Sequence, residues 1–372
     1  MKIKSEDFIR NSGIINEFYN SSLDKYRSIT IDFSEGYYYL TGISNTYARF
    51  KFDIEEFEDL NLVFDSKKFL ALCGMYEEIE LLKIGDADYT FIVQEEEFKL
   101  EHFTDVFFNK EIFNKEQESV NTVIVDSELY SVMKKSTSYI GSQISLINHV
   151  INITNNIAMF RSESNDVYFN KLSKEYKNFT LTKENITFIE KLGIGTEINE
   201  YKKTYRLIKD DGIIFMPKVS FDKEAGFGEL QGKVFTELYS HPNSYFTINK
   251  GEFESVLKSL SPFLADVINS SLYFHVENDN LFIEVKSNDH IKMKLKVYES
   301  ALDDDFEFIL DLSNISKHLK ILEGEEITLQ VSNKMVINPR GTEIESSLCN
   351  IFTDSNESEH MVFFRLRDNV VS

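Results

Sequence analysis

The chain has 372 residues and a formal net charge of −22, from 40 Lys and Arg against 62 Asp and Glu. This acidity argues against a protein whose whole surface adheres to nucleic acid, although it allows a local basic lining. No run of about 18 apolar residues occurs, and the N-terminus lacks the apolar core of a signal peptide. We therefore expect a soluble, cytoplasmic protein without a membrane partner, and the length suits two or three domains.

A short apolar strand followed by an amphipathic helix recurs six times along the chain. Each helix follows a residue that can accept a hydrogen bond from the free amides of a helix start. Successive capping residues are 56 to 67 positions apart, which indicates a six-fold internal repeat. These capping residues are Ser5, Asp65, Asp126, Thr182, Asn249 and Asp311.

The first pair of repeats occupies residues 1–118. We expect two helices here, at 5–20 and from Asp65 to about Tyr76, because apolar residues recur at helical spacing. Residues 109–119 have mixed charges and few apolar side chains, so they are interpreted as a linker. Alternating apolar residues predict strands at 28–33, 37–43, 46–52, 78–84 and 88–93.

The second and third pairs follow the same plan over residues 119–241 and 242–372. Helices are expected at 126–140, 182–193 and 311–322, and another begins at Asn249, with an apolar face formed by Phe253, Val256, Leu257 and Leu260. Residues 221–242 are interpreted as an extended connection. Strands are expected at 146–153, 157–162, 201–208, 213–216, 272–276 and 291–297.

Motifs that carry catalytic or metal chemistry are absent from the sequence. It contains no phosphate-binding G-x-x-x-x-G-K-[ST] loop, no H-E-x-x-H, no C-x-x-C and no G-x-S-x-G. Cys73 and Cys349 lie among apolar residues and are expected to be buried thiols. The acidic run 303–305 fits a solvated loop better than a cation site, because no further ligand spacing accompanies it. We expect no enzyme activity, cofactor or metal, although a carboxylate pair cannot be recognised among so many acidic residues.

Basic residues recur on the predicted helices, whereas acidic residues crowd the other segments. Lysines are common on the solvent-facing side of any single helix. Their recurrence on helix after helix of a strongly acidic chain favours a functional surface. These residues are Arg10, Lys67, Lys68, Lys134, Lys135, Lys183, Lys191, Lys250, Lys258, Lys317 and Lys320.

Three short segments resemble parts of one family, the bacterial DNA polymerase III beta subunit, or sliding clamp. Phe64–Leu70 resembles the helix start of its second repeat, Phe308–Ile315 resembles the strand and helix of its sixth repeat, and Met361–Leu366 resembles its terminal strand. With the six repeats, this resemblance covers essentially the whole chain. It implies an α+β DNA clamp fold with domains 1–118, 119–241 and 242–372, each of two repeats, with the sheets outside and the helices lining a ring. Departures at 162–167, 235–242 and 367–372 fit a divergent, phage-encoded member in a bacterial or phage-infected cell.

The resemblance implies a processivity factor that encircles double-stranded DNA without sequence specificity. It would act as a homodimer and bind DNA polymerase and clamp loader through short peptides. The helix cations would face DNA, with Lys25 and Arg27 as loop candidates. A client-peptide groove between the second and third domains would contain Ile147, Ser162, Val167, Leu238, Tyr239, Met361, Val362, Phe363, Phe364, Arg365 and Leu366.

Helix geometry supports a ring of two chains. Packed helices lie about 10 Å apart, so twelve in a circle leave a hole of about 27 Å after one helix diameter is subtracted. Six helices would leave only about 8 Å, too narrow for a duplex of roughly 20 Å, whose groove depths alone sum to about 16 Å. The alternative is a monomeric replication scaffold that grips DNA without encircling it. Phe363 and Phe364 point to opposite faces of a strand, so one can pack in the core while the other lines the client groove. The alternative is that both are buried in the core of the third domain.

Overall fold

The computed structural model describes residues 2–21, 27–42, 45–55, 58–83, 89–93, 96–98, 108, 110–114, 118–139, 150–154, 156–161, 167–218, 244–264, 271–277, 280–285, 291–295, 299–302, 307–337, 344–353 and 356–366. The chain divides into two compact units. Unit 1 comprises Met1–Tyr130 and Glu184–Ser220, and unit 2 comprises Ser131–Lys183 and Phe221–Ser372. The bounds of these two units differ from those of the three domains expected from the sequence, and the division into three domains stays a prediction.

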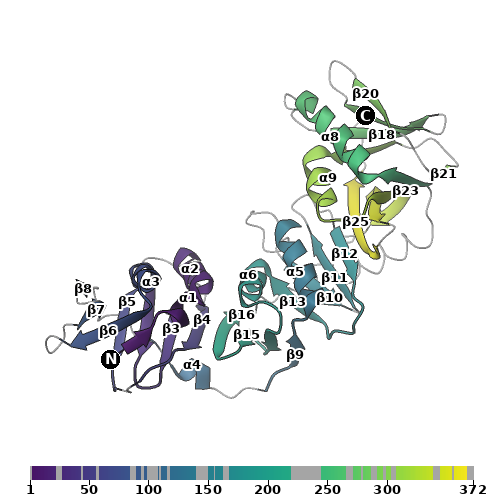
Figure 1. Cartoon of the computed structure of the whole chain (residues 1–372). Helices are drawn as coiled ribbons and strands as arrows, with labels where there is room; N and C mark the ends of the chain where they lie inside the picture. The colour runs from purple at the N-terminus through teal and green to yellow at the C-terminus, as the bar shows by residue number, and fades with distance from the viewer. Residues whose placement is uncertain are drawn as a thin grey trace. The chain divides into compact units, whose positions relative to one another are not determined.

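The helices of the described residues fall where the six repeats place them, with one short addition, α4 (Figure 1). Five of these eight described helices carry a basic residue at or next to one end, among them Arg10 after α1 and Lys320 after α9. Their bounds are α1 Glu6–Ile9, α2 Ser12–Ser21, α3 Ser66–Met75, α4 Glu111–Asn114, α5 Ser127–Tyr139, α6 Lys183–Leu192, α8 Lys250–Leu264 and α9 Leu312–Leu319.

The strands of the first three repeats form short antiparallel meanders, each preceded by one strand before its helix. Their bounds are β1 Lys2–Lys4, β2 Ser28–Asp32, β3 Tyr37–Thr41, β4 Tyr47–Lys51, β5 Asn61–Asp65, β6 Glu78–Lys83, β7 Tyr89–Val93, β8 Glu96–Phe98, β9 Asn121–Ile124, β10 Val150–Thr154, β11 Ile157–Arg161 and β12 Val167–Lys171.

The last three repeats follow the same order, with one additional strand, β21. Their strands are β13 Phe179–Thr182, β14 Glu197–Glu200, β15 Thr204–Lys209, β16 Gly212–Pro217, β17 Ser244–Asn249, β18 Ser271–Glu277, β19 Asn280–Val285, β20 Ile291–Leu295, β21 Glu299–Leu302, β22 Glu307–Asp311, β23 Glu326–Ile337, β24 Ile344–Thr353 and β25 Asn356–Leu366.

Paired repeats exchange their first strands. The strand before each helix pairs with the meander of the sister repeat, as β1 does with β6 and β5 with β2. The same exchange joins β9 to β14, β13 to β10, β17 to β23 and β22 to β18. Each repeat therefore depends on its sister for a complete four-stranded sheet, here called a quartet.

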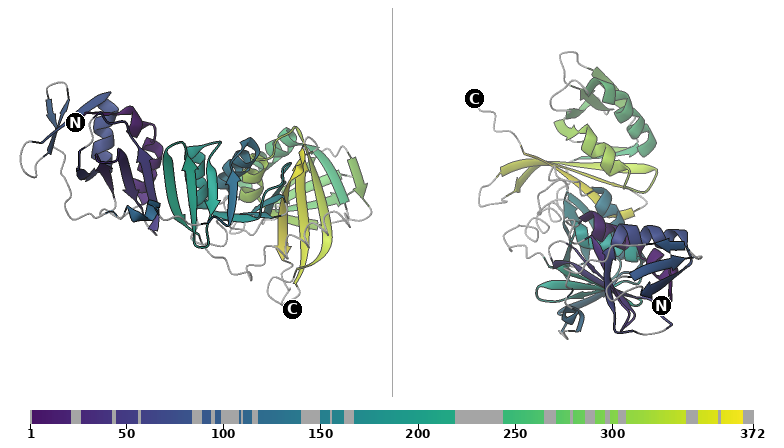
Figure 2. Two further views of the ribbon diagram at one scale, coloured as in Figure 1. Left: turned by 90° about the horizontal axis from the view of Figure 1, so that it is seen from below. Right: turned by 90° about the vertical axis from the view of Figure 1, so that its left-hand side faces the viewer.

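Four of the six quartets are fused in pairs through their fourth strands. Strand β4 pairs with β16 in unit 1, and β12 pairs with β25 in unit 2. The resulting sheets have the orders β5-β2-β3-β4-β16-β15-β14-β9 and β13-β10-β11-β12-β25-β24-β23-β17-β21. The long strands β23 to β25 are the yellow-green to yellow arrows of Figure 2. Among the described residues, the quartets β1-β6-β7-β8 and β20-β19-β18-β22 remain separate.

The core of unit 1 lies between its sheets and its helices, with Phe8 at its centre. The Phe8 ring is fully buried, and its centroid lies 4.7 Å from that of Tyr38, 4.9 Å from Phe69 and 5.5 Å from Phe52. Helices α1 and α2 both pack against α3. In unit 2, α8 packs against α9, and Phe253 of α8 lies 6.2 Å from Phe274 of β18.

Three predicted caps are confirmed and one is wrong. The side chains of Asp65, Asp126 and Asn249 accept hydrogen bonds from backbone amides three residues later, at 2.8, 3.0 and 3.0 Å. Ser5 makes no side-chain cap; its backbone carbonyl accepts the first helical bonds instead. The helix expected at 5–20 is two helices, because the Asn11 carbonyl starts a new turn by accepting from the amides of Ile14 and Ile15.

Two further expectations about helices change. The predicted linker at 109–119 contains α4. Phe113 of α4 is buried against Tyr39 of β3 and Phe215 of β16, strands that are distant in sequence. Helix α8 continues through Pro262 to Leu264, beyond the point where the apolar period changes.

Cys73 is buried as expected, and burial raises the pKa of its thiol to about 12. The Cys349 side chain and the acidic run 303–305 lie outside the described residues.

Candidate nucleic-acid interface and client groove

Most of the predicted DNA-facing cations lie on helices or directly beside their ends, and many are exposed. Lys183 is half-buried at the start of α6. The side chain of Lys317 in α9 and the whole of Lys25 lie outside the described residues. The exposed members of the set are Arg10, Lys67, Lys68, Lys134, Lys191, Lys258 and Lys320.

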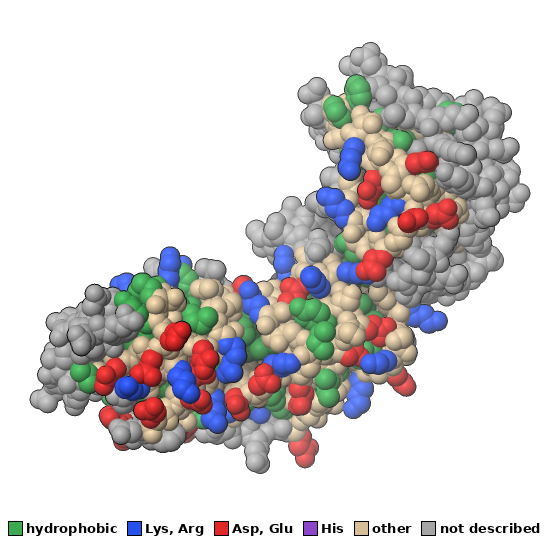
Figure 3. All heavy atoms as spheres, in the orientation of Figure 1, with side chains coloured by type: hydrophobic (Ala, Val, Ile, Leu, Met, Phe, Trp, Pro, Cys, Tyr) green, Lys and Arg blue, Asp and Glu red, His purple; other side chains and the backbone are tan. Residues whose placement is uncertain are grey.

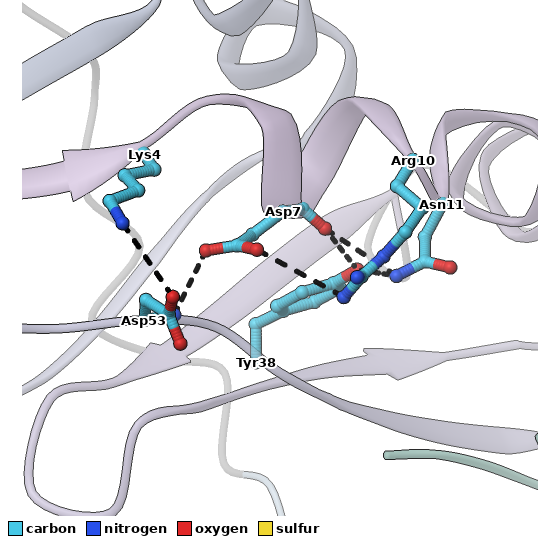
Figure 4. A network of polar contacts seen from close by, with 6 residues as sticks. All are labelled: Lys4, Asp7, Arg10, Asn11, Tyr38 and Asp53. Carbon is cyan, nitrogen blue, oxygen red and sulfur yellow. Dashed lines mark hydrogen bonds and ion pairs between the residues drawn. The ribbon is translucent and has the colours of Figure 1, made fainter. Parts of the chain in front are cut away.

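Arg10 is positioned by a polar network at the end of α1 (Figure 4). Its Nη2 lies 4.0 Å from Oδ1 of Asp7, whose other carboxylate oxygen accepts the Asp53 amide at 2.9 Å. The Tyr38 hydroxyl accepts from Asn11 Nδ2 at 2.9 Å and donates to the Asp7 carbonyl at 3.4 Å. Burial raises the pKa of the Tyr38 phenol well above its usual range. The phenol therefore stays neutral, and the Arg10 side chain is exposed at the surface.

Arg27 and Lys67 converge on one aromatic ring. The Arg27 guanidinium lies 4.8 Å from the centroid of the Tyr19 ring, and Lys67 Nζ lies 5.7 Å from the same centroid. The Arg27 carbonyl also accepts the Ser66 amide at 3.1 Å, which ties this loop to the first turn of α3. Both cations are thereby held over one ring, near the end of α2 and the start of α3.

Three other predicted cations are engaged with the protein. Lys135 Nζ lies 3.3 Å from a Glu323 carboxylate oxygen, and only 16% of the Lys135 side chain is exposed. Lys191 Nζ lies 3.7 Å from Glu17. Lys250 Nζ donates to the Leu322 carbonyl at 2.5 Å and so links the start of α8 to the end of α9. Sequence spacing alone does not separate such structural lysines from exposed ones.

Acidic and basic side chains are interspersed on the described part of the surface drawn in Figure 3. On the face seen in Figure 3, Lys and Arg lie among Asp and Glu rather than in one uniform patch. Among the described residues, no group of three or more His, Cys, Asp or Glu is placed to hold a metal ion. None of the described helices is long and apolar enough to cross a membrane.

The sheet of unit 2 brings together two segments of the expected client groove. Val167, the first residue of β12, pairs with Val362 of β25, and Tyr168 pairs with Met361. Residues Phe363–Leu366 of β25 continue past the start of β12, while on the other side they pair with β24. The backbone therefore places this segment next to the start of β12. Ile147, Ser162, Leu238 and Tyr239, and the side chains of Val167 and Met361–Leu366, lie outside the described residues.

Comparison with known proteins finds the same architecture in solved structures. The sequence matches no family model and no curated protein. The structure matches the DNA polymerase III subunit beta of Pseudomonas aeruginosa with a TM-score of 0.75 at 10% identity over 99% of both chains. It matches the beta subunit of Thermotoga maritima with 0.74 at 14% identity, and the sliding clamp of Bacillus subtilis with 0.71 at 11%, each over 98% of both chains. The chain has the sliding-clamp fold. The resemblance inferred from short segments is thus confirmed for the fold.

Within this sliding-clamp fold, two further cations lie near predicted ones. A cavity of about 130 Å³ in unit 1 is lined by Arg10 and Lys191 together with Lys51 of β4 and Lys209 of β15. Sequence reasoning missed Lys51 and Lys209 because it searched helices, and both lie at strand ends. Lys209 Nζ donates to the Ile194 carbonyl, just after the end of α6. Asp210 and Asp211 also line the cavity, so its four cations lie beside two carboxylates.

Proposed function

We propose that this protein is a DNA sliding clamp, a homodimeric ring that encircles duplex DNA and tethers DNA polymerase and clamp loader through short peptides. The observation that carries the proposal is the strand order. Both fused sheets are joined through the fourth strands of two quartets. Among the described residues, the two remaining fourth strands, β8 and β20, each lie at one end of their sheet. Pairing β8 of one chain with β20 of a second chain, twice, closes a ring and uses every fourth strand.

The charges of these two strands support a head-to-tail contact. Strand β8 includes Glu96 and Glu97, whereas β20 has lysines at the alternate positions 292 and 294. Opposite charges on neighbouring strands stabilise their pairing, and like charges oppose it. Pairing β8 with β20 therefore joins unlike charges, whereas pairing either strand with its own copy would join like charges.

The exposed helix cations support loose contact with DNA. A duplex held only through its phosphates is bound without sequence preference, and lysines on flexible stems let the contact slide. The acidic remainder of the chain repels DNA from the outside of the ring. Encirclement then keeps a tethered polymerase at high effective concentration near the primer end, so processivity needs no catalytic step by the clamp itself.

Neutralising exposed helix lysines is expected to weaken DNA contact without loss of fold. We expect the variant with Lys67, Lys68, Lys258 and Lys320 all changed to Gln to bind duplex DNA with a weaker salt dependence. The slope of the logarithm of the binding constant against the logarithm of the salt concentration should fall by about one for each lysine that contacts a phosphate. Single changes should be mild, because exposed charges contribute little alone. Fluorescence anisotropy at several salt concentrations measures the slope.

The matched control for these changes is a pair of lysines on β1. Lys2 lies 2.8 Å from Glu78 and Lys4 lies 3.7 Å from Asp53, so both form exposed surface ion pairs on the strand that precedes α1. Changing Lys2 and Lys4 to Gln should leave the salt slope unchanged. An equal effect of the two sets would remove the helix lysines from the DNA-facing set.

The client groove is proposed to lie beside residues 363–366 of β25. Among the described residues, this segment extends past the start of β12 and pairs with β24. An apolar groove with few polar groups suits a short peptide anchored by Leu or Phe side chains. Adjacent residues of a strand point to opposite faces, so one of Phe363 and Phe364 would line the groove while the other packs inward.

Replacing Phe363 and Phe364 singly by Ala is expected to separate binding from stability. The groove-lining phenylalanine should cost about tenfold or more in affinity for the C-terminal peptide of the partner polymerase, the size of a modest hot-spot contact. The inward phenylalanine should mainly lower the melting temperature. Calorimetric titration and thermal unfolding of both variants provide the two readouts. Two variants that lose only stability would place the groove elsewhere.

Retention on DNA tests the clamp function itself. Protein loaded on nicked circular DNA should remain bound during gel filtration at moderate salt, and cutting the circle once should release it within minutes, because a ring slides off a free end. A scaffold that grips DNA without encircling it would leave both forms at the same rate.

A further inference from the structure

The seam between β4 and β16 is short for a junction inside an eight-stranded sheet. Only three residue pairs join the two strands, from Tyr47 with Phe215 to Arg49 with Ile213. The neighbouring β15–β16 hairpin has six pairs. Three backbone pairs form a weak junction, so side chains on the two faces of the sheet must hold it.

Residue 108 and residues 110–114, which include α4, cross this seam on one face of the sheet. We call these residues the strap. Phe113 lies 5.2 Å from Phe215 of β16 and 5.7 Å from Tyr39 of β3, measured between ring centroids, and all three rings are buried. Phe108 lies 4.7 Å from Tyr39 and 6.0 Å from Tyr47 of β4. The strap therefore packs on strands from both sides of the seam, and α4 is seen beside this sheet in Figure 1.

Arginine side chains bracket the aromatic cluster. The Arg49 guanidinium lies 4.6 Å from the Tyr37 ring centroid and 5.2 Å from that of Phe113. The Arg206 guanidinium lies 4.5 Å from the Phe215 ring centroid. Cations over aromatic faces add attraction beyond the burial of the rings. Arg49 comes from β4 and Phe113 from the strap, so this contact also ties the strap to the seam.

An ion pair fixes the start of the strap. The Asp32 side chain, at the end of β2, is fully buried, and its Oδ2 pairs with Lys110 Nζ. Oδ1 of Asp32 accepts from the Ser34 amide at 3.0 Å and from the Ser34 hydroxyl at 2.6 Å. Loss of Lys110 would leave a buried carboxylate without its counter-charge, which is strongly unfavourable.

Helices cover the seam in a second place. Phe18 of α2 and Phe188 of α6 lie 5.1 Å apart between ring centroids, and Lys191 of α6 pairs with Glu17 of α2. These contacts join the two repeats that meet at the seam. Together with the strap, they hold a three-pair junction through side chains from two sets of elements.

We propose that the strap holds the β4–β16 seam as a rigid joint and that the Lys110–Asp32 ion pair keeps the strap in place. The joint belongs to the folded chain alone and does not depend on clamp activity. Breaking this ion pair loosens the seam before the rest of unit 1, because the strap's contacts with Tyr39, Tyr47, Phe215 and Arg49 lie over the seam.

Hydrogen exchange of the full-length protein tests this proposal. In Lys110→Met, amides of β4 and β16 should exchange about 10- to 100-fold faster, the range expected from losing a hydrogen bond to a charged group, while amides of β6 change less. Lys2→Met removes an exposed ion pair with Glu78 and should leave the seam unchanged. The double variant Asp32→Asn with Lys110→Met should restore much of the protection, because no charge is then left buried.

Phe113→Leu gives a milder release should Lys110→Met fail to fold. It keeps an apolar side chain but removes the ring that contacts Arg49 and Phe215. Faster exchange confined to β4, β16 and the strap is the expected result for this variant. Unchanged exchange at the seam, or equal acceleration throughout unit 1, would overturn the joint in either variant.

Discussion

Replacing Phe8 by Ala is expected to lower the free energy of unfolding of unit 1 by about 3–5 kcal/mol, the usual cost of truncating a buried phenylalanine. Phe8 is fully buried and contacts Tyr38, Phe52 and Phe69, so little of the cavity can collapse. In a unit of this size the melting temperature should fall by about 10 °C. Differential scanning calorimetry measures the shift.

The control for this variant is a phenylalanine on the surface. Phe263 in α8 is 50% exposed, so Phe263→Ala should change stability by no more than about 0.5 kcal/mol. A Phe8→Ala protein that melts with the wild type would contradict the assignment of Phe8 to the centre of the core.

Reversing the charge of β20 is expected to disrupt the proposed dimer. In the variant with Lys292→Glu and Lys294→Glu, β20 would face the acidic β8 of the other chain with like charge. Such juxtapositions cost several kcal/mol, so the dissociation constant should rise at least about 100-fold. Sedimentation velocity across a concentration series measures this constant.

A compensating change in β8 distinguishes charge pairing from damage to the strand. Adding Glu96→Lys and Glu97→Lys to the β20 variant restores unlike charges at both contacts and should recover the dimer. The pair Lys67→Glu and Lys68→Glu makes the same charge change on α3 and should leave the dimer intact. A dimer that survives the β20 reversal unchanged would rule out this edge as the interface.

Local patterns allowed the helices and several caps to be predicted because their interactions are short in sequence. Asp65 caps α3 through the amide of Lys68, three residues away, and the apolar spacing of α8 is visible within one window. The exchange of first strands could not be predicted in this way. Ile3 lies between two polar residues, a pattern that predicts a strand but does not specify its partner. Packing in the folded chain pairs Ile3 with Ile79.

The functional surface was less predictable than the fold. Exposed lysines such as Lys258 and structural ones such as Lys250 share one helix and one residue type. Only the position of the Leu322 carbonyl, 72 residues away, makes Lys250 a link between helices. The strap was missed for the same reason, since Phe113 is the single large buried residue of α4 and its partners lie on β3 and β16.

A covalently closed dimer offers the most direct test of encirclement. Glu97→Cys and Lys292→Cys, in a background with Cys73 and Cys349 changed to Ala, would be joined by a bismaleimide after the protein is loaded on circular DNA. We predict a complex that survives detergent and high salt on the circle and falls apart when the DNA is cut once. Equal loss from circular and linear DNA after cross-linking would contradict the ring.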